Sequence, residues 1–201
     1  MKGCMPLTDA QLLAAREAMG GYYRARNRAL FMLGCYSGFR VSELCSLRVR
    51  DVMSGGRVAT HVTVARRHMK RKTESRTVMI APQARPYLAA HVALMRARGF
   101  VSGYNYLFRS RAGDRPISIS QAWRILAAAQ VAAGAPSRGT HAMRKSFADR
   151  IYRTLLARQA AGEPVDAFRL TSKALGHKDI KSTDQYLGFL VSDIEQAICA
   201  L

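Results

Sequence analysis

Five short elements of this 201-residue sequence carry side chains that could act together on an anionic substrate. In chain order they contain Arg40 after a Gly-Phe pair, the lysines Lys70 and Lys72 in a basic stretch, His141 and Arg144 three residues apart, His177 after a glycine, and Tyr186 nine residues later. Arginine binds anionic oxygens in pairs, histidine moves protons near neutral pH, and a deprotonated tyrosine is a nucleophile. Alone, each element also fits a structural role, such as a surface arginine or a core tyrosine.

Three segments hold most of these residues, and their order is more informative than any single one. The segments are Ser37-Gly-Phe-Arg-Val-Ser-Glu-Leu44, Thr140-His-Ala-Met-Arg-Lys-Ser-Phe147 and Leu175-Gly-His-Lys-Asp-Ile-Lys-Ser-Thr-Asp-Gln-Tyr-Leu187. Together they resemble the catalytic domain of the tyrosine recombinase (phage integrase) family, over about residues 8–197. The resemblance implies that family's catalytic-domain fold, which is mostly α with a small antiparallel β-sheet (α+β).

The resemblance also implies roles for individual residues. Arg40 and Arg144 match the two catalytic arginines of the family, and His141 matches the histidine three positions before the second arginine. His177 matches the family's His/Trp position. Tyr186 matches the nucleophile, and its nine-residue step from His177 is the family's usual spacing.

The family places one further catalytic residue, a lysine, on a β-hairpin. Lys72 is favoured because Lys72-Thr-Glu-Ser-Arg-Thr-Val fits the family's lysine followed by a basic residue and an apolar strand, and Lys70 is the alternative. The implied activity is site-specific DNA recombination or integration, with cleavage and rejoining through a 3′-phosphotyrosyl intermediate. No metal, ATP or other cofactor is implied. The implied partner is double-stranded DNA, on which a homotetramer would assemble.

Phosphodiester cleavage explains why such residue types are needed. Attack on the phosphorus gathers negative charge on the non-bridging oxygens, and two arginines can bind that charge in place of a metal. Ionising a tyrosine of pKa about 10 at pH 7 costs about 4 kcal/mol, so a histidine that accepts the proton removes most of that cost. The departing 5′-oxygen is a poor leaving group as an alkoxide, and a lysine can protonate it. The phosphotyrosine ester conserves the bond energy, so the step reverses.

The charge of the chain independently favours a nucleic-acid partner. Thirty-two Lys and Arg face 13 acids, a net charge of +19, and 25 of the 32 are arginine, whose fork matches phosphate oxygens. Residues 57–76 alone carry seven cations and one acid, a net +6. We therefore expect DNA contacts from the cations of this stretch and from the lysine after Arg144, namely Arg66, Arg67, Lys70, Arg71, Arg76 and Lys145.

Other function classes lack their sequence signals. The histidines and acids show no HExxH or paired-carboxylate spacing, and there is no phosphate-binding GxxxxGK[ST] motif. We therefore expect no metal site. The sequence has no run of 18 uncharged apolar residues and no signal peptide, so we expect a cytoplasmic protein without a membrane partner. Cys35 and Cys45 lie in apolar patterns and are expected to be reduced core thiols.

Apolar periodicity and turn residues predict the elements that position these side chains. Helices are expected over residues 8–20, 25–37, 40–50, 82–97, 120–133, 166–175 and 182–199. A further helix is expected with Thr140 as its N-cap and the apolar stripe Met143, Phe147, Ile151 and Leu155. Two β-branched runs, 57–65 and 76–81, predict a hairpin with a basic tip. Trp123, Ile125 and Leu126 are the expected apolar anchors of the 120–133 helix. The C-terminal helix could pack in cis or dock on a neighbouring subunit.

The sequence departs from the family pattern in three places. The pattern begins almost at Met1, so we expect a single catalytic domain over residues 1–201 without the N-terminal DNA-clamping domain that members commonly carry. His141 and His177 are 36 residues apart, about ten more than usual, and we place the extra stretch at residues 158–166. Lys145 stands where histidine is frequent.

Two other functions fit parts of the same pattern. A type IB topoisomerase-like activity would use the same tyrosine, arginines and lysine, but would relax supercoils without a specific site. A non-catalytic DNA-binding regulator on the same fold would bind DNA without cutting it. Because all the catalytic positions are filled, the sequence argues against the non-catalytic regulator, whereas relaxation of supercoils without a specific site would favour the topoisomerase-like activity.

Overall fold

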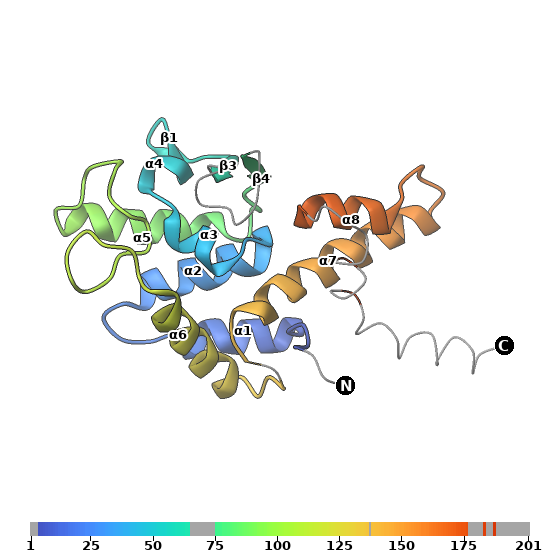
Figure 1. The fold of residues 1–201 in the computed structure, drawn as a ribbon, viewed down its shortest axis with the longest axis horizontal. Helices are drawn as coiled ribbons and strands as arrows, with labels where there is room; N and C mark the ends of the chain where they lie inside the picture. The colour runs from blue at the N-terminus through green and yellow to red at the C-terminus, as the bar shows by residue number, and fades with distance from the viewer. Residues whose placement is uncertain (1–3, 65–74, 137, 177–182, 184–186, 188–201) are drawn as a thin grey trace.

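The computed structural model describes residues 4–64, 75–136, 138–176, 183 and 187 (Figure 1). The helices are α1 Asp9–Ala18, α2 Arg24–Ser37, α3 Val41–Ser46, α4 Val49–Val52, α5 Arg85–Ala97, α6 Ile119–Ala132, α7 Thr140–Ala160 and α8 Ala167–Leu175. In Figure 1, α1 to α6 form the body, while α7 runs out of it and forms an arm with α8. The fold is mostly helical with small antiparallel sheets, as the sequence predicts.

Helix α2 lies at the centre of the body and is buried on most sides. Leu30, Phe31 and Leu33 are fully buried, and the helix packs against α5 and α7. It ends at Gly38, whose φ of +62° is the left-handed conformation that favours glycine. A Cβ at Gly38 would lie 2.4 Å from a ring carbon of Phe147 on α7. The glycine therefore lets α7 approach the end of α2, next to Arg40.

The described helix boundaries agree with the sequence pattern except in two places, and the helix expected over residues 182–199 lies outside the described residues. Gly139 rather than Thr140 is the N-cap of α7, and Thr140 is the first residue of that helix. Thr8 caps α1 with a reciprocal Thr8–Gln11 capping box, as expected at that position. The single helix expected over residues 40–50 is wrong, because the chain forms α3 and α4 instead. Leu47 between them is extended, and its carbonyl accepts a hydrogen bond of 2.8 Å from the Leu107 backbone. Burial of Leu47 against this loop outweighs continuation of the helix.

The two predicted strands pair with each other. The strand β3 His61–Val64 lies antiparallel to β4 Arg76–Met79, with Val62 opposite Val78 and Val64 opposite Arg76. A second pair, β1 Met53–Ser54 and β2 Arg57–Val58, was not expected, and residues 57–65 are divided between β2 and β3. The expected basic tip of the hairpin, residues 65–74, lies outside the described residues.

One residue of α6 that was expected in the core, Trp123, is not buried. Leu126 is fully buried and Ile125 partly buried, but Trp123 is 48% exposed and is not a core anchor. Its indole instead covers Gly139, where a Cβ would lie 2.3 Å from Nε1. Trp123 faces the turn that precedes α7, because α6 buries Ala122, Leu126 and Ala129 on another side.

The expectation for two cysteines is confirmed. Cys35 and Cys45 are buried free thiols, and burial raises the pKa of both to about 12. Their thiolate forms, which are the reactive species, are therefore scarce at neutral pH. Across the residues that the structure describes, no helix combines the length and the apolar character needed to cross a membrane.

Candidate active site

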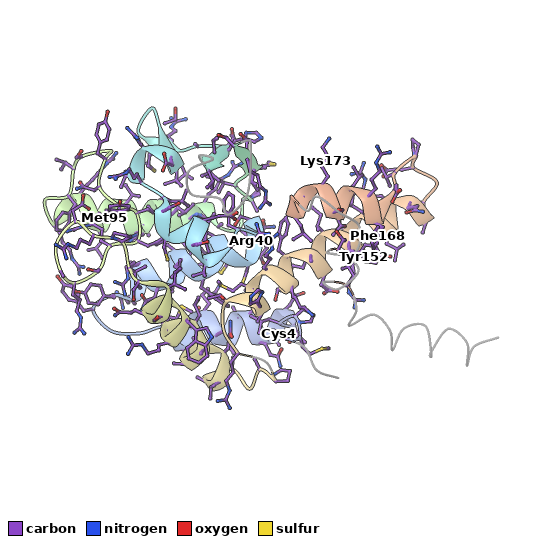
Figure 2. All side chains as sticks on the ribbon, viewed as in Figure 1. Cys4, Arg40, Met95, Tyr152, Phe168 and Lys173 are labelled. Carbon is purple, nitrogen blue, oxygen red and sulfur yellow. The ribbon has the colours of Figure 1, made fainter. Side chains whose placement is uncertain are left out.

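Arg40 lies at the N-terminus of α3 and is tied to Glu43. Its backbone N–H donates to Glu43 Oε2 at 2.7 Å, and its Nη1 lies 3.3 Å from Glu43 Oε1. Glu43 is 1% exposed, whereas the Arg40 side chain is 44% exposed. Figure 2 shows Arg40 at the edge of the body that faces α8. The buried carboxylate therefore fixes one edge of the guanidinium and leaves the rest of the group accessible.

Arg76, the first residue of β4, joins three parts of the fold. Its Nη2 donates to the carbonyl of Ala174 in α8 and, at 3.4 Å, to that of Ser37 at the end of α2. Its Nη1 lies 3.9 Å from Glu43 Oε2, and its guanidinium carbon lies 5.3 Å from the Phe39 ring centroid. The guanidinium therefore holds the hairpin, the body and the arm together at one point.

Arg144 is buried beside the same group of residues. It is 1% exposed on α7 and donates to the carbonyl of Gly38 and, at 2.8 Å, to that of Leu175. Gly38 precedes Arg40 by two residues, and Leu175 follows Ala174, which Arg76 binds. Arg40, Arg76 and Arg144 therefore gather where α2, β4, α7 and α8 meet.

Two of these three guanidinium groups, those of Arg40 and Arg76, lie beside the buried carboxylate of Glu43. Burial and the charges of Arg144 and Arg40 lower the pKa of Arg76 to about 10, and Glu43 acts in the opposite direction. Arginine remains charged at neutral pH at that value, so the three side chains repel one another. A bound anion would offset this repulsion, as a phosphate does among clustered arginines. We name Arg40, Glu43, Arg76 and Arg144 the arginine site.

A separate clamp fixes the start of α7. Gly139 caps the helix with a φ of +96°, and the buried Gln130 side chain both accepts from its N–H and donates to its carbonyl, the latter at 3.1 Å. His141 is exposed in the first turn of α7, one turn before Arg144, and Lys145 is partly exposed. These hydrogen bonds therefore fix the N-terminal end of α7, which carries His141 and Arg144.

The remaining predicted site residues lie outside the described part of the chain. They are Arg66, Arg67, Lys70, Arg71, Lys72, His177 and Tyr186. Both described neighbours of Tyr186 are buried: Thr183 is 0% exposed and Leu187 is 6% exposed. Leu187 belongs to a small cluster with Ala148, one helical turn after Arg144, and with Leu175, whose carbonyl Arg144 binds. Leu187 therefore packs against a neighbour of Arg144 on α7 and against the residue whose carbonyl Arg144 binds.

Sequence reasoning did not assign a site role to Glu43 or Gln130. Glu43 had a usable signal, because a Glu three residues after a helix start indicates a capping box. Gln130 had none, since its partner Gly139 is recognised only from the fold. Within the described residues, no three His, Cys, Asp or Glu side chains are grouped so that they could hold a metal ion.

Replacing Arg76 by lysine should destabilise the protein although the charge is kept. An ammonium group cannot reproduce the planar fork that joins Ser37, Ala174 and Glu43, so buried carbonyls lose a charged donor. We expect a loss of about 2–3 kcal/mol in the free energy of unfolding, measured with urea. Arg57→Lys, on the exposed strand β2, is the matched control. Unchanged stability with weaker DNA binding would instead assign Arg76 to DNA contact.

The fold and the arginine site define the class of protein. A helical body, a short antiparallel hairpin, and two arginines brought together from α3 and α7 are the features implied by the resemblance in the sequence. Residues 9–189 match the phage integrase family. The chain therefore belongs to the phage integrase (tyrosine recombinase) family.

Similar proteins agree with this assignment. "Probable integrase/recombinase YoeC" of Bacillus subtilis (strain 168) is 31% identical over 127 residues, which are 63% of each chain. The XerA recombinase structure has a TM-score of 0.75 at 21% identity, covering 100% of this chain and 64% of its own.

Two structures solved with DNA share the fold at greater distance. A post-cleavage complex of XerH with difH DNA has a TM-score of 0.67 at 22% identity, covering 96% of this chain and 52% of XerH. A lambda integrase dimer bound to a COC' core site has a TM-score of 0.63 at 17% identity, covering 92% and 49%. This chain thus spans about half to just under two thirds of the length of each of these four relatives.

Proposed function

We propose that this chain is the catalytic unit of a site-specific recombinase or integrase, which cuts and rejoins duplex DNA through a 3′-phosphotyrosyl intermediate. The observation that carries the proposal is the arginine site. Three guanidinium groups gather there, and two of them lie beside the buried carboxylate of Glu43. Leu187, the residue after Tyr186, packs with Ala148 and with Leu175, whose carbonyl Arg144 binds. Tyr186 precedes Leu187 in the sequence, and we propose that it attacks a phosphate bound by these arginines.

In the proposed reaction, Tyr186 Oη attacks the phosphorus and the bond to the 5′-oxygen breaks. Arg40 and Arg144 stabilise the charge that develops on the non-bridging oxygens. A histidine accepts the tyrosine proton, and His141 is a candidate because it lies one helical turn from Arg144, with His177 as the other. Lys72 donates a proton to the departing 5′-oxygen. Attack by a 5′-hydroxyl on the phosphotyrosine reverses these steps and rejoins a strand.

The test is a nicked suicide duplex, from which the short leaving strand diffuses away after cleavage. We expect the protein to become covalently attached to the 3′-phosphate without added metal or ATP. Attachment together with relaxation of supercoiled plasmids that lack a specific site would favour a topoisomerase-like activity. DNA binding without any covalent product would instead indicate a non-catalytic regulator.

The general acid can be distinguished by two matched variants. Lys72→Ala should reduce adduct formation far more than Lys70→Ala, because only the residue that protonates the 5′-oxygen affects departure of the leaving group. A 5′-bridging phosphorothioate leaves without protonation, so it should restore cleavage by the Lys72 variant. If the phosphorothioate restored cleavage by the Lys70 variant alone, Lys70 rather than Lys72 would be the general acid.

DNA affinity should depend steeply on salt because of the net charge of +19. If roughly six to ten phosphates are contacted, affinity should fall about 10³- to 10⁵-fold between 50 and 200 mM salt. Fluorescence anisotropy with a labelled duplex measures this slope directly. An affinity that changes less than about tenfold over this range would contradict phosphate contact on this scale.

We further propose a homotetramer on DNA, with the C-terminal helix docked on a neighbouring subunit. The support is an apolar groove of about 550 Å³ beside Arg76, between β4 and the arm, with Met79, Phe147 and Leu170 in its walls. The mass of the DNA-bound assembly tests the number of subunits. Cross-linking of the groove to the C-terminal helix distinguishes docking in trans from packing in cis.

Because its proposed substrate is DNA of a bacterium, phage or mobile element, we place the protein in the cytoplasm.

A further inference from the structure

A second cluster of arginines surrounds a cavity far from the arginine site. The cavity holds about 200 Å³ at the N-terminal end of α2, between α5 and the loop that follows it. Figure 2 shows Met95, in its wall, on the opposite side of the body from Arg40. The polar and aromatic groups of the wall include the arginines Arg26, Arg98, Arg109 and Arg111 and the tyrosines Tyr22 and Tyr23.

The cations of this cavity outnumber their described counter-charges. Arg26 is 5% exposed, and the bonds it makes are to neutral oxygens: Nη1 to the Arg109 carbonyl at 2.7 Å, and Nε and Nη2 to Asn27 Oδ1 at 3.1 and 2.9 Å. Arg109 pairs with Asp114 at 3.1 Å, which is not in the wall. Among the described residues that line the cavity there is no Asp or Glu. Buried charges are normally paired, so this arrangement suits an added anion.

The pKa values of two groups in the cavity wall, Arg26 and His91, are affected by the positive charge around them. Burial lowers the pKa of Arg26; Tyr23 acts in the opposite direction, and the charge of Arg111 lowers it further. The pKa of His91, also in the wall, is lowered to about 4, by burial and then by the charges of Arg26 and Arg98. His91 is therefore neutral at physiological pH and adds no charge of its own.

Aromatic rings hold the guanidinium planes in place. The guanidinium carbon of Arg98 lies 3.9 Å from the Tyr22 ring centroid, that of Arg109 lies 3.2 Å from Phe100, and that of Arg26 lies 4.4 Å from Tyr23. These cation–π contacts restrict the arginine side chains, and Arg98 and Arg111 are exposed, so their N–H groups are accessible to a ligand. The side chains are thus ordered before any ligand arrives, which favours tight binding.

We propose that this cavity is a second anion site, which binds a single phosphate group through Arg26, Arg98 and Arg111. Its volume of about 200 Å³ is below the range of about 300–1,000 Å³ typical of sites for drug-sized ligands, so a small anion fits it better. Eleven residues of α2 separate Arg26 from Ser37, about 16 Å along the helix axis. The phosphate could belong to flanking DNA or to a free phosphate compound, and both present the same chemistry.

The test compares two double variants that remove equal charge from exposed positions. Arg98→Gln with Arg111→Gln changes the cavity, whereas Arg96→Gln with Arg115→Gln changes exposed arginines outside its wall. Both are made in an Arg40→Gln background to weaken phosphate binding at the arginine site. Inorganic phosphate is titrated at constant ionic strength, with the melting temperature as readout. We expect the cavity variant to bind phosphate at least tenfold more weakly than its control.

A DNA titration of the same variants, with Arg40 intact, identifies the source of the phosphate. Loss of this one phosphate contact should reduce the slope of log affinity against log salt by about 0.9 in the cavity variant alone. Weaker phosphate binding with this smaller slope assigns the site to the DNA backbone, and weaker phosphate binding with an unchanged slope assigns it to a free phosphate compound. Equal phosphate binding by the two variants overturns the proposal, whatever the slope. The phosphate arm requires no cleavage, so its result is independent of the proposed function.

Discussion

Replacing Tyr186 by phenylalanine should abolish covalent attachment to a nicked suicide duplex and leave DNA affinity nearly unchanged. The substitution removes one oxygen, which is the attacking atom in the proposed reaction, and keeps the ring. Without a nucleophile the arginines can still bind the phosphate, but no ester forms. Adduct is measured as a protein band of reduced mobility on a denaturing gel, and affinity by anisotropy at a fixed salt concentration.

Tyr152→Phe is the matched control for this prediction. Tyr152 lies on α7 and is packed against the same small cluster of Ala148, Leu175 and Leu187. Its hydroxyl has no role in the proposed chemistry, so adduct formation should continue at close to the rate of the unmodified protein. Adduct formation by the Tyr186 variant would assign the nucleophile to another residue.

Replacing Glu43 by glutamine should cost about 3–5 kcal/mol in the free energy of unfolding, since it breaks a buried ion pair by removing one partner. Glutamine can still accept the hydrogen bond from the Arg40 backbone, so the capping geometry of α3 is retained. What is lost is the charge near Arg40, Arg76 and Arg144. Adduct formation should fall as well, because the repelling guanidinium groups separate.

Two measurements distinguish this account from a general loss of packing. Phosphate or sulfate should recover part of the lost stability of the Glu43 variant, because the anion replaces the missing charge. Glu17→Gln, which removes an exposed carboxylate paired with Arg16 and Arg28, should cost at most about 1 kcal/mol. If neither anion stabilises the Glu43 variant more than the Glu17 variant, Glu43 does not hold the arginine site together.

Much of the fold is readable from the sequence because it depends on local signals. Thr8, Gly38, Asp166 and Gly176 begin or end helices where capping residues predict such boundaries. The β-branched run after residue 57 predicts a strand for the same kind of reason. Each of these signals acts within a few residues, so a single sequence contains it.

What could not be predicted depends on contacts between distant segments. The break between α3 and α4 is set by the loop at Leu107, and Trp123 is exposed because α6 turns another side to the core. At the arginine site, the sequence indicates Arg40 and Arg144 by motif. The sequence does not show that Arg76 lies close enough to feel the charge of both, or that Glu43 is the carboxylate beside Arg40 and Arg76. Those facts require the hairpin and the arm to meet at the end of α2.

The most direct test of the account is the identity of the residue that carries the DNA in the trapped adduct. Trypsin cleavage after Lys181 releases residues 182–201, in which Tyr186 is the only tyrosine. After nuclease treatment, mass spectrometry should find a nucleotide 3′-phosphate attached to this peptide, with fragment ions that place it on Tyr186. A nucleotide on any other residue would contradict the claim that Tyr186 attacks a phosphate held by Arg40 and Arg144.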